Sequence, residues 1–186
     1  SLLIAWSYFH KIYEDNSKLS QNVLLLAPNT IVLERLKTDI VGLKIFNSDP
    51  VIPPNGYAGK SWNFYPKVHI QDNISTLSKS GNIFLTNIQR FTSRTNKIGQ
   101  DYSIDYFLGD KPVAKKTDNK VLIKDIVKNI EDIIIMNDEA HHIHDKKMAW
   151  NKTIENVHLN LIQRGSKLPL QLDVTATPKH QNGNIF

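Results

Sequence analysis

The stretch Ile133-Ile134-Ile135-Met136-Asn137-Asp138-Glu139-Ala140-His141 decides how this chain is interpreted. Four large apolar residues are followed, after Asn137, by two adjacent carboxylates and a nearby histidine. A continuous apolar run, rather than an alternating one, predicts a strand that is buried on both faces. Because ligands of open parallel sheets bind outside the carboxyl ends of the strands, Asp138 and Glu139 stand where a site would form. Two carboxylates there can organise a divalent metal ion and polarise a water molecule.

A second predicted strand ends in a comparable way. Residues 170–174 form a strand-like run that leads into Thr175-Ala176-Thr177-Pro178. Between the two predicted strands, apolar residues at helical spacing over 150–161 indicate a helix that ends before Gly165. The two polar strand ends therefore follow one another in the chain with a helix between them.

The rest of the chain continues this alternation. Residues 1 to about 15 have the spacing of an amphipathic helix, and Thr30 can cap a helix that follows the turn at Pro28-Asn29. Residues 47–66 predict an irregular loop, and the polar residues 92–119 predict an insertion. Further strands are predicted at 23–27, 68–70 and 82–86, and a further helix at 121–130. This order predicts an α/β fold with a mostly parallel sheet covered by helices on both faces, which is the RecA-like architecture.

The composition limits the classes of protein that need to be considered. At 186 residues, with 40% hydrophobic and 22% charged residues, the chain suits one soluble globular domain. The absence of cysteine excludes disulfides and thiolate metal sites, and no apolar run is long enough to span a membrane. These features suit a cytoplasmic protein. The net charge of +5 permits binding to a phosphate backbone, but a solvated basic surface explains that charge equally well.

Asp138-Glu139-Ala140-His141 and Thr175-Ala176-Thr177 resemble motifs II and III of superfamily 2 helicases and translocases. The resemblance implies that Asp138 binds Mg²⁺ through water and that Glu139 orients and deprotonates the water that attacks ATP. It also implies that His141 bonds to Thr175 or Thr177 and links the ATP site to the DNA-binding side. The alternative interpretation of the acidic pair is a solvated turn after a strand.

Two further stretches resemble DNA-contacting elements of the same superfamily. Ala27-Pro28-Asn29-Thr30 looks like motif Ia, in which a helix N-terminus offers amides to a phosphate, so Asn29 and Thr30 are candidate DNA contacts. Thr86-Asn87-Ile88-Gln89-Arg90 resembles the Thr-x-x-Gln element of restriction translocases, which makes Thr86, Gln89 and Arg90 candidate phosphate contacts. Such contacts position a protein on DNA without identifying its sequence. The first stretch is also explained by a plain strand-to-helix turn with a threonine cap.

Gly59-Lys60-Ser61 looks like the end of a phosphate-binding Walker A loop, but its context argues against that assignment. Pro54 occupies the position of the first glycine, and the segment follows motif Ia instead of preceding it. The helix at residues 1–15 suits the helix that follows the phosphate loop in the superfamily. We therefore expect G-x-G-K-T a few residues before Ser1, outside this chain. The chain would then be a single partial RecA-like domain over 1–186, from motif Ia to motif III, with little ATPase activity of its own.

The resemblance extends to one branch of the superfamily, the restriction subunits of type III systems. The stretches that carry it are Val23–Leu36, Asp49–Pro54, Val68–Asp72 and Asn82–Gln89. Membership implies ATP and Mg²⁺ as cofactors, DNA bound mainly through its backbone, and a methyltransferase (modification) subunit as partner of the parent protein. Type I restriction motors and DNA-repair helicases remain open. No nuclease motif is present in this sequence.

Two other classes of function remain as alternatives. One is a degenerate RecA-like module that binds DNA or protein without hydrolysis. The other is a metal-dependent hydrolase that uses Asp138, Glu139 and the neighbouring histidines. His141, His142, His144 and Asp145 could hold zinc, but they lack the H-E-x-x-H spacing that places two ligands on one helical face.

Overall fold

The computed structural model describes residues 1–48, 52, 56, 59–71, 76–87, 130–138 and 149–175. Within these residues, five strands form one sheet in the order β2-β3-β1-β4-β5, and each neighbouring pair is parallel. The strands are β1 (Asn22–Ala27), β2 (Lys67–Ile70), β3 (Asn82–Asn87), β4 (Ile134–Asp138) and β5 (Gln171–Val174). The predicted α/β fold with a parallel sheet is confirmed.

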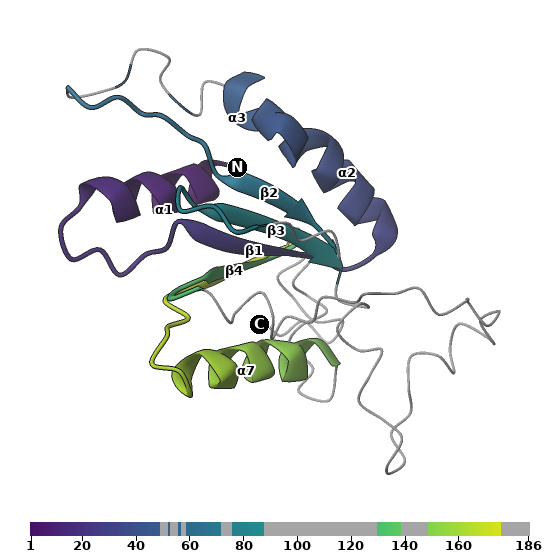
Figure 1. Cartoon of the computed structure of the whole chain (residues 1–186). Helices are drawn as coiled ribbons and strands as arrows, with labels where there is room; N and C mark the ends of the chain where they lie inside the picture. Colours follow the sequence, from purple (N-terminus) through teal and green to yellow (C-terminus); the bar gives the residue numbers. More distant parts are fainter. Residues whose placement is uncertain are drawn as a thin grey trace, which may run out of the picture.

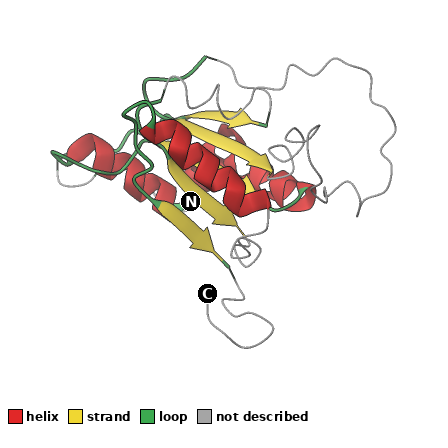
Figure 2. Cartoon of the chain, turned by 90° about the horizontal axis from the view of Figure 1, so that it is seen from below, coloured by secondary structure: helices red, strands yellow, loops and turns green. Residues whose placement is uncertain are grey.

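Helices cover both faces of the sheet (Figure 1). The helices are α1 (Leu2–Tyr13), α2 (Thr30–Ile40), the 3₁₀ turn η1 (Val41–Leu43), α3 (Lys44–Ser48) and α7 (Ala149–Ile162). Seen from below, the strands lie between α7 in front and the remaining helices behind (Figure 2). No helix among the described residues is both long enough and apolar enough to cross a membrane.

The run that leads into Asp138 is buried on both sides, as its sequence predicts. Ile134 and Met136 pack into the core formed with α1, α2 and α3, whereas Ile133 and Ile135 pack into the core formed with α7. Successive side chains of a strand point to opposite faces, so a strand between two helical layers must be apolar at every position. This double burial places the polar residues that follow the run at the rim of the sheet.

The segment after α2 forms structure that the sequence pattern does not predict. Gly42 has φ 68° and ψ 15°, a left-handed conformation that glycine adopts at little cost, and it separates α2 from the short helix α3. Phe46 of α3 is buried, and the centroid of its ring lies 4.6 Å from the ring centroid of Phe64. The predicted irregular loop at 47–66 begins too early, because residues 47–48 belong to α3. Its part at 59–66 contributes the buried ring of Phe64 to the core.

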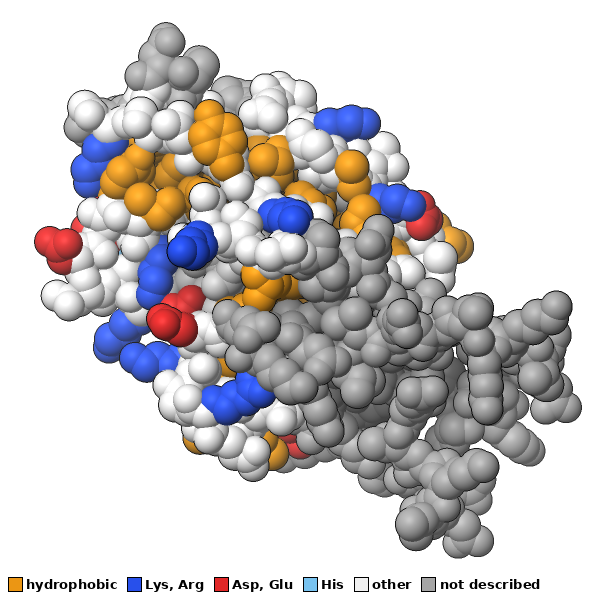
Figure 3. Space-filling model, in the orientation of Figure 1, with side chains coloured by type: hydrophobic (Ala, Val, Ile, Leu, Met, Phe, Trp, Pro, Cys, Tyr) orange, Lys and Arg blue, Asp and Glu red, His pale blue; other side chains and the backbone are white. Residues whose placement is uncertain are grey.

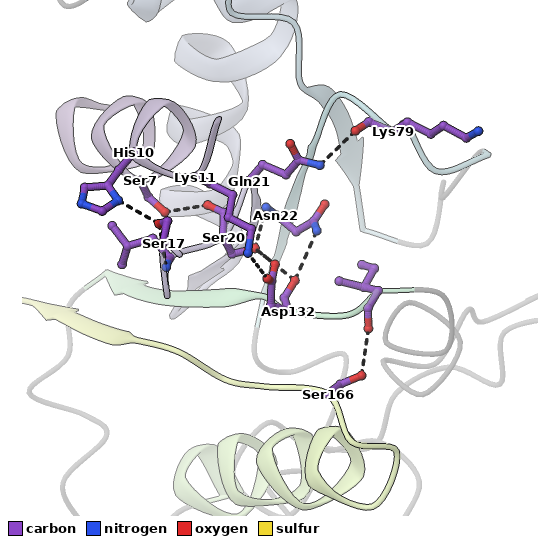
Figure 4. Close-up of polar contacts among 12 residues, drawn as sticks. Ser7, His10, Lys11, Ser17, Ser20, Gln21, Asn22, Lys79, Asp132 and Ser166 are labelled. Carbon is purple, nitrogen blue, oxygen red and sulfur yellow. Dashed lines mark hydrogen bonds and ion pairs between the residues drawn. The ribbon is translucent and has the colours of Figure 1, made fainter. Parts of the chain in front are cut away.

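Polar contacts at the amino edge of the sheet join α1 to the start of β4 (Figure 4). Ser20 Oγ donates to Asp132 Oδ1 at 2.6 Å, and Lys11 Nζ of α1 forms an ion pair with Asp132 Oδ2 at 2.8 Å. Ser7 Oγ donates to the Ser20 carbonyl at 2.6 Å. These bonds hold the C-terminal part of α1 at the amino ends of the strands, so the start of α1 is directed toward their carboxyl ends.

A buried histidine lies between β2 and β3. His69 is 1% exposed, and its ring stacks on Phe84 with 4.9 Å between ring centroids. Its Nε2 donates to Asn82 Oδ1 at 2.9 Å, while Nδ1 is buried without a hydrogen-bond partner among the described residues. Burial lowers the pKa of His69 below its usual 6.5; the bond to Asn82 opposes this shift, and the charge of Lys67 adds to it.

We expect the free energy of unfolding to fall as pH decreases below about 6.5, because unfolded His69 then binds a proton that the folded protein resists. The folded pKa lies below the unfolded one, so the contribution is complete above pH 6.5 and is lost on acidification. One such proton gives a slope of at most about 1.4 kcal/mol per pH unit. Urea unfolding between pH 7.5 and 5.5 measures the slope. His69→Gln should reduce it and the exposed His158→Gln should not; equal slopes in wild type and His69→Gln would contradict the assignment.

Candidate functional site

The register of the sheet brings the predicted strand ends to one edge. Leu26 of β1 pairs with Thr86 of β3 and with Asn137 of β4, and Asp138 pairs with Val174 of β5. Because all five strands are parallel, their carboxyl ends meet along the same rim, where α/β proteins bind ligands. The candidate residues that lie at this rim within the described ranges are Asn29, Thr30, Thr86, Asp138 and Thr175.

The remaining candidates lie outside the described residues, so their roles stay predictions. They are Glu139, His141, Ala176, Thr177, Gln89 and Arg90. The histidines and aspartate of the alternative zinc site, His142, His144 and Asp145, also lie outside these ranges.

Asp138 ends β4 on the face that α2 covers. Its side chain is 22% exposed, and Oδ2 lies 3.2 Å from Nη2 of Arg35, a residue of α2. A carboxylate at a strand end offers the hard oxygen donors that Mg²⁺ prefers. Among the described residues, no three side chains of the ligand types His, Cys, Asp or Glu come together. Asp138 is therefore the described residue of the Asp-Glu-Ala-His motif that offers an oxygen ligand at this edge.

A polar pair, formed by a buried asparagine and an exposed aspartate, joins the two strands that carry the motifs. Asn137 is fully buried, and its Nδ2 donates to Asp173 Oδ1 at 2.6 Å. Gln171 Nε2 also approaches both oxygens of Asp173, at 3.1 and 3.2 Å. A hydrogen bond to an ionised carboxylate is stronger than a neutral one, so this contact helps fix β4 beside β5. Sequence reasoning did not single out this pair, although a polar residue between the apolar run and the acidic pair was a visible signal.

Asn29, and not Thr30, caps helix α2. Asn29 has extended backbone angles (φ −150°, ψ 175°), and its Oδ1 accepts from the Val32 amide at 3.0 Å. Thr30 is already the first residue of the helix, so the expected threonine cap was wrong. Asn and Thr both favour the cap position, and the point where the backbone leaves the extended conformation decides between them. The start of α2 is exposed, with Ile31 at 83%, and is accessible to a DNA backbone.

The other described candidates differ in accessibility. Thr86 is buried, and its Oγ1 lies 3.5 Å from the Asn87 carbonyl, so its hydroxyl is not presented at the surface in this conformation. Thr175 directly follows β5 and is partly exposed.

Lys60 of the Walker-like Gly59-Lys60-Ser61 lies away from the carboxyl edge of the sheet. Its Nζ lies 4.8 Å from the centroid of the Tyr13 ring and 3.4 Å from the Tyr13 carbonyl, at the C-terminal end of α1. The lysine therefore interacts with α1 in this structure.

The basic side chains do not form a single patch on the face seen in Figure 3. Lysines and arginines are scattered there among apolar and uncharged side chains. The net charge of +5 is thus compatible with binding to DNA but does not locate the contact.

Comparison with known protein families gives an independent assignment. Residues 2–180 match the family described as "Type III restriction enzyme, res subunit". A comparison with curated protein sequences finds no match. The family match spans nearly the whole chain and agrees with the motifs at the strand ends. The chain therefore belongs to the type III restriction enzyme res subunit family, which is related to helicase superfamily 2.

Proposed function

We propose that this chain is part of the ATP-dependent DNA translocase or helicase motor of a restriction endonuclease subunit, and that it couples hydrolysis of Mg-ATP to movement of DNA. One observation carries the proposal: the sheet register sets Asp138 beside Val174, so the Asp-Glu-Ala-His and Thr-Ala-Thr motifs start next to each other at the carboxyl edge. Residues 1–186 would form the motif Ia to motif III part of one RecA-like domain, with an insertion at 92–119. The parent protein would act in the cytoplasm.

The chemistry would be divided between neighbouring residues of the Asp-Glu-Ala-His motif. Asp138 would hold Mg²⁺ through water, and the ion would neutralise charge on the phosphates of ATP. Glu139 would orient the attacking water and accept its proton. His141 would bond to Thr175 or Thr177 and transmit the state of the nucleotide site to the DNA-binding side. The fully buried Asn137 and its partner Asp173 support the strand ends from which these motifs start.

The DNA would be held mainly through its phosphates. Asn29 and Thr30 at the exposed start of α2, together with Gln89 and Arg90, are the proposed contacts, whereas the buried hydroxyl of Thr86 would not reach the DNA in this conformation. Such contacts position the motor without selecting a sequence. A methyltransferase subunit would join the assembly as a partner of the parent protein.

The proposal is tested by measuring ATP hydrolysis by the full-length protein with Mg²⁺, in the presence and absence of duplex DNA. We expect DNA to stimulate hydrolysis and EDTA to abolish it. DNA affinity should fall steeply with salt, because each phosphate contact releases counterions. Salt-dependent DNA binding without hydrolysis would instead support a degenerate module that only binds DNA. An ATP hydrolysis rate that DNA does not change would contradict the proposed motor function.

A further inference from the structure

The guanidinium of Arg35 forms an ion pair with Asp138, the carboxylate to which we assign the magnesium ion. Arg35 Nη2 lies 3.2 Å from Asp138 Oδ2, although the two residues are 103 positions apart in the chain. Two other ion pairs occur among the described residues: Lys11–Asp132 at the amino edge and Lys37–Glu34 within α2. Of these three ion pairs, the one between Arg35 and Asp138 joins α2 to a motif residue at the carboxyl end of a strand.

The backbone of Arg35 is held in place by the rest of α2. Leu33 and Ile40 of this helix are buried in the core, and Asn29 caps its first turn. The Arg35 side chain itself is 65% exposed, so it can leave Asp138 without disturbing the core. Asp138 is less accessible and cannot move far, because it ends a strand paired on both sides. The partner that can move away from the ion pair is therefore the arginine.

We propose that Arg35 is a positioning residue that holds the Asp138 carboxylate in the nucleotide-free protein and must release it when the metal ion binds. This inference rests on the proposed function only in assigning magnesium to Asp138. The guanidinium contacts Oδ2 of Asp138, so its positive charge lies beside the site of a water-bound divalent cation, and the two like charges repel each other. Arg35 therefore weakens metal binding and keeps Asp138 compensated until the nucleotide brings its metal ion.

The effect is limited in size because the arginine is exposed. Solvent-exposed ion pairs contribute little net free energy, so removing Arg35 should tighten metal binding by only about two- to five-fold. Screening by salt should reduce the difference further, since the interaction is between charges accessible to solvent. The metal affinities of wild type and the Arg35 variant are thus expected to converge as the salt concentration rises.

The test uses Mn²⁺ as a spectroscopic probe, with binding to the full-length protein measured by EPR in the presence of ADP. Arg35→Ala should lower the Kd for Mn²⁺ about two- to five-fold at low salt. Arg35→Lys should stay close to wild type, because it keeps the charge. The matched control Lys37→Ala removes a cation from the same helix that pairs with Glu34, and it should leave the Kd unchanged.

A double-mutant cycle ties the effect to the carboxylate. Asp138→Asn should weaken Mn²⁺ binding and should abolish the gain from Arg35→Ala. The inference would be overturned if the Arg35→Ala variant bound Mn²⁺ no more tightly than wild type, or if the tighter binding persisted with Asp138→Asn.

The results also separate the inference from the proposed function. An unchanged Kd for Arg35→Ala together with DNA-stimulated hydrolysis would reject the inference and leave the motor function intact. If Arg35→Ala tightens Mn²⁺ binding only when Asp138 is present, but the protein does not hydrolyse ATP, the inference is supported and the motor function is rejected. If Asp138→Asn leaves Mn²⁺ binding unchanged, both the magnesium assignment and the inference are rejected.

Discussion

Replacement of Glu139 by glutamine is expected to lower DNA-stimulated ATP hydrolysis roughly a hundred- to ten-thousand-fold, the usual cost of losing a positioned general base. Glutamine has nearly the same size and shape as glutamate, but its amide cannot accept the proton of the attacking water. The KM for ATP should change little, because the lost interaction matters in the transition state more than in the bound substrate. Steady-state hydrolysis with saturating duplex DNA measures both quantities.

The matched control is Glu131→Gln. Glu131 is exposed and precedes the same strand at the opposite, amino edge of the sheet, so its variant should retain wild-type hydrolysis. Binding of DNA should also survive in Glu139→Gln, which separates a chemical defect from a folding defect. Unchanged hydrolysis in Glu139→Gln would remove this residue from its proposed role as the base.

The strands that carry the motifs could be predicted from sequence because local patterns of apolar residues indicate their burial. The run Ile133–Met136 is apolar at every position, and the structure buries it between two helical layers. The strand ends at Ala27, Asp138 and Val174 were visible because polar or turn-forming residues follow each of them. Once a parallel sheet is predicted, these ends must share one edge, so the location of the candidate site followed from the fold class.

The contacts within the site could not be predicted in the same way, because they depend on tertiary geometry. Arg35 and Asp138 are 103 positions apart, and nothing local to either residue indicates the other. Asn137 finds Asp173 only once the register of β4 and β5 is known. The helix α3 spans five residues, which is too short for helical periodicity to be recognised, and its buried Phe46 is an isolated signal.

Asn82→Leu is expected to lower the free energy of unfolding by about 2–5 kcal/mol, because it leaves several polar groups without partners. Asn82 is buried at the start of β3 and its amide makes four hydrogen bonds. Oδ1 accepts from the Ser78 amide at 2.8 Å and from His69 Nε2 at 2.9 Å. Nδ2 donates to Asn22 Oδ1 and to the Ser78 carbonyl, both at 2.9 Å. Leucine fills a similar volume but satisfies none of these groups.

The loss would be large relative to the total stability of a domain, which is typically about 5–15 kcal/mol. Urea unfolding followed by circular dichroism measures it. Gln21→Ala is the matched control: its side chain also bonds near the amino edge, to the Lys79 carbonyl, but the bond is exposed and its loss should cost less than about 0.5 kcal/mol. Because Asn82 lies at the edge opposite to Asp138, hydrolysis per folded molecule should be preserved wherever the Asn82→Leu variant remains folded. Equal unfolding midpoints for Asn82→Leu and wild type would mean that water replaces the lost bonds, whereas reduced hydrolysis by the folded variant would mean that the two edges of the sheet are not independent.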